Sequence, residues 1–132
     1  MKYHNLIKAA QKAIKSSYSP YSKFRVGAAV QTTSGKIYTG CNIENSSFSL
    51  TICAERTALF KAVSESHRKF KAIAIISDNE EITPPCGACR QVIFELAGNI
   101  DVILANAKGR TKVVKVSHLL PIPFDGKMLA HR

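Results

Sequence analysis

Two short cysteine motifs constrain this chain more than any other feature. The first is Cys53-Ala54-Glu55, and the second, about thirty residues later, is Pro85-Cys86-Gly87-Ala88-Cys89. Each motif stands where we predict a helix to begin. Two cysteines three residues apart at a helix start project from one face and can both bind a tetrahedral zinc ion, and a cysteine from another helix completes three ligands. The spacing therefore predicts a metal site with its fourth position open to water.

Glu55 places a candidate proton carrier beside that open position. It follows Cys53 by two residues, which is too far around a helix for a ligand on the same face but close enough to lean over the metal. Zinc can lower the pKa of bound water from about 16 toward about 7, and a shielded carboxylate can then move the proton. A purely structural zinc site has no use for such a group, so the motif favours hydrolysis.

Three thiolates leave a zinc ion with a surplus of about one negative charge, which works against ionisation of bound water. The amide groups at the predicted helix starts can draw some of this charge from the sulfurs. Arg56 and Arg90 stand near the ligands in the sequence, and either guanidinium could hydrogen-bond a sulfur.

A closed structural site is the alternative interpretation. In it Cys41 is the fourth ligand and Glu55 is an ordinary acidic residue in a first helical turn. The other interpretation of Cys41 is a small hydrophobic residue buried in a strand, which is common for a free cysteine. The histidines show no ligand spacing, and these are His4, His67, His118 and His131.

The composition is that of one ordinary globular domain. The chain has 132 residues, of which 45% are hydrophobic and 21% charged. We expect a single domain over residues 1–132, small enough that neighbouring subunits could help to close a pocket. We expect the N-terminal segment to be neither a signal peptide nor a membrane span. Cysteines in a chain of this kind favour a reducing compartment, so we expect a cytoplasmic protein without a membrane partner.

The net charge of +10 raises the possibility of nucleic-acid binding. The basic residues are scattered, however, and no exposed aromatics are interleaved with them, so we expect a solvated basic surface and no nucleic-acid partner. A zinc-stabilised module that binds RNA stays open as an alternative from another class. It predicts a coordination sphere saturated by cysteines.

The order of the predicted elements indicates an α/β fold. We expect a helix over 2–16, a hairpin of strands 24–32 and 36–42, a loop over 43–51, a helix over 53–64, a strand over 71–77, a helix over 87–96, strands over 101–106 and 111–116, and a last short helix capped by Ser117. Strand-helix-strand units imply parallel pairing with helices stacked on the sheet. Both metal-bearing helices should then begin at the same edge of the sheet.

The stretches Cys53-Ala54-Glu55-Arg56 and Pro85-Cys86-Gly87-Ala88-Cys89-Arg90-Gln91 resemble the zinc-dependent cytidine deaminases, specifically the small kind whose metal ligands are all cysteines. Residues 24–29 and 40–45 are also similar, so the resemblance covers about residues 20 to 95. It implies a three-layer sandwich in which helices cover both faces of a mixed five-stranded sheet. It also implies one zinc per subunit, held by Cys53, Cys86 and Cys89, and a homotetramer.

The resemblance also implies roles for single residues. Zinc-bound hydroxide would attack C4 of the cytosine while Glu55 shuttles protons, and Arg56 would hydrogen-bond a ligand sulfur. Phe24 and Ala54 would contact the substrate, with the Phe24 ring on the pyrimidine. Asn42 and Glu44 would hydrogen-bond the 3′-hydroxyl of a free ribose.

The Asn42 and Glu44 pair carries the expected substrate class. A carboxylate beside the 3′-hydroxyl would repel a 3′-phosphate, which favours free cytidine and deoxycytidine in pyrimidine salvage over polynucleotides. Deaminases that edit RNA or single-stranded DNA typically have a histidine as first ligand, whereas this chain has Cys53. Antibiotic-directed relatives lack the Asn-x-Glu pair. By resemblance again, Phe124 is the candidate aromatic that covers a neighbouring subunit's site.

Overall fold

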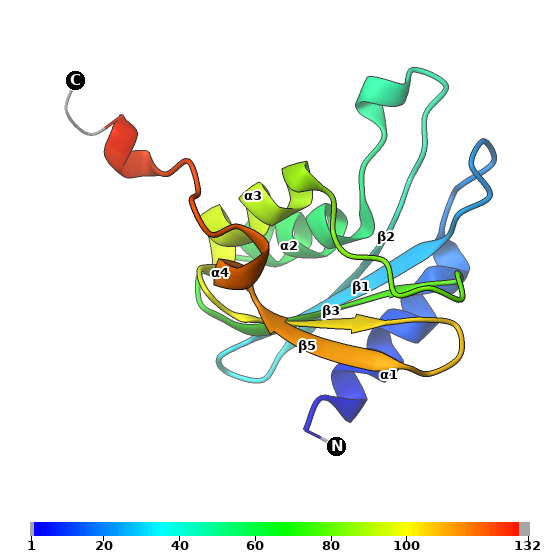
Figure 1. Ribbon diagram of the computed structural model, residues 1–132, viewed down its shortest axis with the longest axis horizontal. Coiled ribbons are helices and arrows are strands. Elements are labelled where there is room, and N and C mark those ends of the chain that lie inside the picture. Colours follow the sequence, from blue (N-terminus) through cyan, green and yellow to red (C-terminus); the bar gives the residue numbers. More distant parts are fainter. Residues whose placement is uncertain (1, 130–132) are drawn as a thin grey trace.

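A mixed five-stranded sheet forms the centre of the molecule (Figure 1). The structure is a computed structural model, and it describes residues 2–129. The strands lie in the order β2-β1-β3-β4-β5. Only β3 and β4 pair in parallel, and the other neighbours are antiparallel. The strands are β1 (Val26–Thr32), β2 (Ile37–Cys41), β3 (Phe70–Ser77), β4 (Asp101–Ala105) and β5 (Thr111–Lys115).

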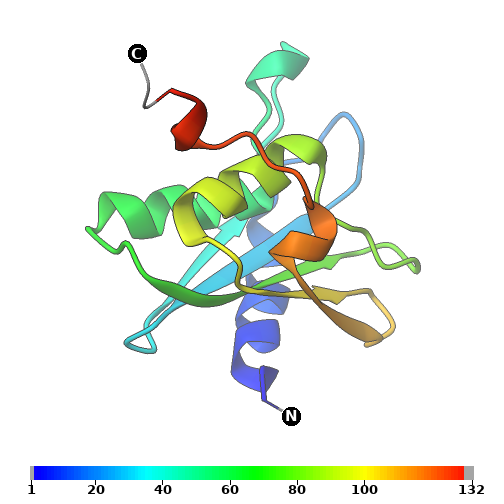
Figure 2. The same cartoon turned by 60° about the vertical axis from the view of Figure 1, so that its left-hand side comes forward.

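Helices cover both faces of this sheet, as the sequence predicted. Helix α1 (His4–Ala13) lies on one face, and α2 (Ala54–Ser64) and α3 (Gly87–Ala97) lie on the other (Figure 1). A four-residue helix α4 (Val116–Leu119) follows β5, and the C-terminal segment then passes the end of α3 (Figure 2). Short 3-10 turns occur at Ile14–Ser16, Phe48–Leu50 and Gly126–Met128. The result is three layers.

Strand β3 is central because its side chains are needed on both faces. Six consecutive residues, Ala72 to Ser77, are buried. Ile73 and Ile75 pack under α2 and α3, while Ala74 and Ile76 pack against α1. Such continuous burial is typical of a strand covered on both faces.

Two glycines let the helices approach the sheet closely. A Cβ at Gly40 would lie 2.5 Å from the Ala58 nitrogen and 2.6 Å from the Ala54 oxygen of α2, and a Cβ at Gly27 would lie 2.2 Å from the Ala10 oxygen of α1. Only a residue without a side chain fits at such a distance. Gly40 therefore sets how closely the start of α2 lies to the sheet.

The predicted elements all occur, with differences at their ends. The first strand begins at Val26 rather than residue 24, because the backbone of Phe24 bonds to side chains: its N–H donates to the Ser22 hydroxyl and its carbonyl accepts from Asn42. The prediction that Ser117 caps the last helix is wrong, since Lys115 is the cap residue and Ser117 lies inside the helix. No helix within residues 2–129 has the length and apolar character needed to cross a membrane.

Candidate active site

The three predicted ligand cysteines meet where two helices begin. Cys53 and Cys86 are the N-cap residues of α2 and α3, and Cys89 lies in the first turn of α3. Their sulfurs all lie within 4.8 Å of one another, and the Cys53 and Cys86 sulfurs are 3.8 Å apart. Zinc-sulfur bonds of about 2.3 Å in a tetrahedron place two sulfurs about 3.8 Å apart. The donor set therefore fits a zinc ion.

Neighbouring groups stabilise negative charge on the Cys53 sulfur. The pKa of Cys53 is lowered to about 5, because of a hydrogen bond with Cys89 and because the Arg56 guanidinium lies against it. The Arg56 Nη2 atom is 3.4 Å from the Cys53 sulfur. Arg90 instead donates to the backbone oxygens of Pro85 and Leu119. Of the two arginines, only Arg56 is placed to neutralise thiolate charge.

The Glu55 carboxylate lies beside this cluster and away from bulk water. Only 4% of the surface of Glu55 is exposed. Burial raises the pKa of Glu55 above its ordinary value, and the negative charge of Cys53 acts in the same direction. A carboxyl group with a raised pKa takes up a proton more readily than an ordinary one, and general acid-base catalysis requires a group that can take up and release protons.

A pocket of about 250 Å³ connects the cysteines to the predicted substrate residues. One end contains Cys53, Ala54, Glu55 and Cys86, and the other contains Phe24, Asn42 and Glu44. Residues that the sequence reasoning did not single out also line the pocket, among them Ser22, Thr51, Ile52, Thr83 and Pro84. The fold thus joins segments far apart in the chain into one cavity with a metal end and a polar end.

Hydrogen bonds hold both polar residues at the far end. Asn42 Nδ2 donates to the Phe24 carbonyl at 2.7 Å, and Asn42 Oδ1 accepts from the Val26 N–H at 3.0 Å and from the Ser17 hydroxyl. Since an amide NH2 carries two hydrogens, one donor of Asn42 is left for a ligand.

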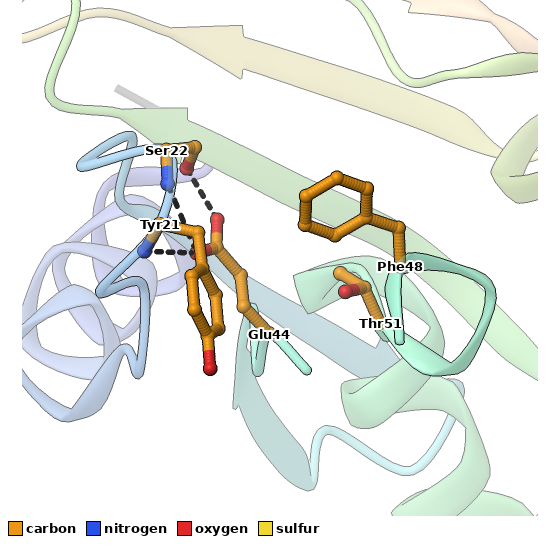
Figure 3. A pocket seen from close by; sticks show the side chains of 5 residues that line it. All are labelled: Tyr21, Ser22, Glu44, Phe48 and Thr51. Atoms are coloured by element: carbon orange, nitrogen blue, oxygen red, sulfur yellow. Dashed lines mark hydrogen bonds between the residues drawn. The ribbon is translucent and has the colours of Figure 1, made fainter. Parts of the chain in front are cut away.

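Glu44 has a similar set of partners. Its Oε1 atom accepts from the backbone N–H groups of Tyr21 at 3.0 Å and Ser22 at 3.1 Å, and its Oε2 atom accepts from the Ser22 hydroxyl (Figure 3). The hydrogen bond from Ser22 is the main cause that lowers the pKa of Glu44.

Ser17 and Ser22 are thus site residues that sequence reasoning missed. Both lie in the turn-rich segment Ser-Ser-Tyr-Ser-Pro-Tyr-Ser, whose repeated serines beside Phe24 were the available signal. A serine in a turn ordinarily bonds to its own backbone, so its composition alone did not indicate contacts with a distant strand end.

Comparisons with known proteins identify the family. The family described as "Cytidine and deoxycytidylate deaminase zinc-binding region" matches residues 1–105. The chain belongs to this family. This family binds zinc, and the cluster of Cys53, Cys86 and Cys89 is able to hold such an ion.

Individual relatives match over nearly the whole chain. A cytidine deaminase of Sporosarcina psychrophila is 51% identical over 132 residues, covering 99% of this chain and 97% of its own length. One from Halalkalibacterium halodurans is 51% identical over 123 residues, covering 92% and 93%. The crystal structure of cytidine deaminase from Burkholderia pseudomallei superposes with a TM-score of 0.90 at 46% identity, covering 94% of this chain and 100% of that one. The predicted family and three-layer fold are confirmed.

The alternative of a closed four-cysteine site is wrong. Cys41 is buried on β2, paired with Gly27 of β1, and burial raises the pKa of its thiol. Among the residues that the structure describes, only Cys53, Cys86 and Cys89 are grouped closely enough to hold a metal ion, so the histidines there make no such cluster either. His131 lies outside the described residues. The saturated sphere that a zinc-stabilised RNA module requires is therefore not formed.

Phe124 lies apart from this chain's own pocket. It belongs to the C-terminal segment and is 59% exposed, and its carbonyl accepts a hydrogen bond from the Gln91 side chain of α3 at 2.7 Å. The lining of the substrate pocket does not include it among residues 2–129.

Proposed function

We propose that this protein hydrolyses free cytidine and deoxycytidine to uridine and deoxyuridine, with release of ammonia, in pyrimidine salvage. The observation that carries the proposal is the single pocket that joins a three-cysteine cluster and a buried glutamate to Asn42 and Glu44. Names of similar proteins agree, since the relatives from Sporosarcina psychrophila and Halalkalibacterium halodurans are both cytidine deaminases.

The residues of the metal end would perform the proton transfers. Zinc held by Cys53, Cys86 and Cys89 would supply a Lewis acid that makes water acidic enough to attack at neutral pH. Glu55 would take up one proton of that water and give it to ring nitrogen N3. It would then take up the second proton, from the hydroxyl group added at C4, and give it to the departing amine. Arg56 would keep the Cys53 sulfur from donating too much charge.

The residues of the polar end would select the substrate. The Phe24 ring would pack on the pyrimidine, and Ala54 would line the base site. The free N–H of Asn42 and the fixed carboxylate of Glu44 would donate to and accept from the 3′-hydroxyl. Because Glu44 is ionised, a 3′-phosphate would meet both repulsion and a steric block, so polynucleotides would be excluded.

We also propose a homotetramer in which each site is covered by a neighbouring subunit. Large apolar side chains are exposed on the loops that also carry the pocket residues Ser22, Glu44 and Thr51, and on the C-terminal segment. They are Tyr18, Tyr21, Ile43, Phe48, Leu50, Ile122 and Phe124. Apolar surface of this kind is typical of subunit contacts. Phe124 is our candidate for the aromatic that reaches a neighbour's site. Residues 1–132 would act as one deaminase domain in the cytoplasm, where a reducing environment keeps its free thiols available for zinc.

The deciding experiment is an assay that compares cytidine with cytidine 3′-phosphate as substrates. Zinc-loaded protein should convert cytidine with release of ammonia and the ultraviolet change of cytosine to uracil, and should not convert cytidine 3′-phosphate. Absence of cytidine turnover would exclude the proposed reaction, and equal turnover of both compounds would exclude the role given to Glu44.

Glu55→Gln tests the proton carrier separately. The amide has the same shape but cannot carry protons, so kcat should fall by a factor of about 10³ or more while one zinc per chain is retained. Glu65→Gln, at the exposed C-terminal end of the same helix, is the matched control and should keep full activity. A Glu55→Gln protein with normal kcat would contradict the mechanism.

A further inference from the structure

One hydroxyl group links the residues proposed to hold the base and the sugar. The Ser22 Oγ atom accepts a hydrogen bond from the Phe24 N–H at 3.0 Å and donates its own hydrogen to Glu44 Oε2. Ser22 also lines the substrate pocket together with both residues. Figure 3 shows Ser22 and Tyr21 on one side of the Glu44 carboxylate, with Phe48 across the neighbouring hollow of about 360 Å³. The Phe24 N–H therefore orients the Ser22 hydroxyl, which directs its own hydrogen at the Glu44 carboxylate.

Glu44 depends on these contacts because its own backbone leaves the side chain unconstrained. It lies beyond the end of β2, and its N–H donates to the Tyr18 carbonyl at 2.8 Å. A glutamate side chain that is not buried has many accessible rotamers, and ordering it is costly. Three donors from residues 21 and 22 select one rotamer. A carboxylate has about four lone-pair sites, so one acceptor site on Oε2 is left for a ligand.

The backbone between Ser22 and Phe24 also indicates that this segment is held in one conformation. Lys23 lies between Ser22 and Phe24 and has a φ of 60°, in the left-handed region that a lysine rarely adopts. Such a conformation persists only where the surroundings impose it. Here the Lys23 N–H is held by the Ser19 carbonyl, and Phe24 is held by Ser22 on one side and Asn42 on the other. The segment 17–24 is thus clamped in one shape against the end of β2.

We propose that Ser22 is a positioning residue for sugar recognition: its hydroxyl aims the Glu44 carboxylate at the 3′-hydroxyl of the nucleoside. This inference rests on the proposed function and adds to it a residue that acts only through Glu44. Loss of the hydroxyl leaves the two backbone donors on Oε1 but removes the bond that fixes Oε2, so it loosens the carboxylate, weakens substrate binding and leaves the chemistry at the metal end unchanged.

The test compares kinetic constants of serine variants. Ser22→Ala should raise KM for cytidine about tenfold, as expected for a lost hydrogen bond to a charged group, with kcat within about twofold of the original. Ser22→Thr retains a hydroxyl and should restore KM to within about threefold. Ser117→Ala, at an exposed serine of α4 that does not line the pocket, is the matched control and should leave both constants unchanged. A fall in kcat at unchanged KM in Ser22→Ala would overturn the proposal.

A second substrate separates positioning from a general loss of structure. With 3′-deoxycytidine the partner of Glu44 is absent, so Ser22→Ala and the original protein should have equal KM values. The Ser22→Ala effect should also vanish in a Glu44→Ala background. Equal increases of KM with cytidine and with 3′-deoxycytidine would show that Ser22 does not act through Glu44. Ser22→Cys, which keeps the volume and offers only a weak donor, makes the same comparison if Ser22→Ala does not fold.

Failure of the inference and failure of the proposed function give different results. If the original protein does not convert cytidine, the proposed function fails. If it converts cytidine and Ser22→Ala converts it with the same KM, only the role of Ser22 is wrong.

Discussion

The two ends of the substrate pocket are built in different ways. The metal corner, formed by Cys53, Glu55, Cys86 and Cys89, stands on the first turns of two helices that pack against the core. The rim, formed by segments 17–24 and 42–51, consists of loops whose polar side chains hold one another. Cys89 and Glu55 are buried, whereas Tyr21 and Phe48 are exposed. Rigid helices thus position the groups proposed for chemistry, and tied loops position those proposed for recognition.

This difference implies that the two ends respond differently to substitution. The groups of the metal corner would act together on one zinc ion and one water molecule, so a change at any of them should abolish activity. A change at the rim removes one of several hydrogen bonds at a more exposed place, so it should alter KM by a modest factor.

Removal of a cysteine ligand should have the largest effect on activity. Cys86→Ala deletes an exposed cysteine at the N-cap of α3, so the core stays intact while the zinc site loses a thiolate. We expect bound zinc to fall well below one per chain and activity to fall by a factor of about 10³ or more. Metal analysis and the cytidine assay measure both quantities.

Cys41→Ala is the control for this experiment. Cys41 is buried on β2 away from the cluster, so the variant should retain zinc and lose only stability, by about 1 kcal/mol for a small cavity. Zinc loss in Cys41→Ala, or full zinc content in Cys86→Ala, would contradict the three-cysteine site.

A substitution at Gly40 should affect the metal corner and spare the rim. A methyl group there would collide with the backbone of α2 at Ala54 and Ala58, so the helix that carries Cys53 and Glu55 must shift. We expect Gly40→Ala to lower the free energy of unfolding by about 1 to 3 kcal/mol and to reduce kcat more than it raises KM. Denaturant titration and steady-state kinetics measure these effects.

Gly126→Ala serves as the matched control, because a Cβ at Gly126 meets no atom within 4 Å among the described residues and its φ is not positive. It should change stability by less than about 0.5 kcal/mol. A Gly40→Ala protein with unchanged stability and kcat would show that α2 can move without disturbing the ligands.

The smallest effect on activity is expected on the far face of the sheet. The Tyr3 hydroxyl donates to Asp101 at 2.5 Å, and Lys115 pairs with the same carboxylate at 2.9 Å. Tyr3→Phe should lower stability by about 1 to 2 kcal/mol near neutral pH and leave kcat and KM unchanged. This variant shows whether a general loss of stability by itself changes KM, as a substitution at the rim is expected to do.

The pH dependence of this loss follows from both groups. Burial and the bond to Asp101 raise the pKa of Tyr3 to about 12, so its contribution is complete below the ordinary value of 10 and disappears as the pH rises from 10 to about 12. The pKa of Asp101 is lowered, mainly by Tyr3, so its contribution is complete above the ordinary value of 3.8 and disappears as the pH falls below that value. The stability difference between Tyr3→Phe and the original protein should be constant from about pH 5 to 9 and shrink outside that window. A difference that does not vary with pH would rule out this bond as its source.

Residue patterns predicted the elements well where one physical signal dominated. The apolar run around Ile73 and Ile75 indicated a central strand, and the cysteine spacing indicated two helix starts. The predicted start of the first strand at Phe24 was wrong, because the Phe24 backbone bonds to the side chains of Ser22 and Asn42 in place of a neighbouring strand. The predicted cap at Ser117 was wrong because β5 passes directly into α4, whose cap residue is Lys115, two residues before Ser117. Such ends depend on partners that are distant in the sequence.

By itself, the sequence determined the chemical groups and their local geometry: three thiolates and a carboxylate at helix starts, because helical spacing fixes which side chains share a face. Only the tertiary structure decided which groups share a cavity. The close approach at Gly40 places α2 over the sheet, and the crossover from β3 through α3 to β4 brings Cys86 to Cys53. The hydrogen bonds from Ser17 and Ser22 to Asn42 and Glu44 likewise exist only once distant segments have packed together, which no local pattern records.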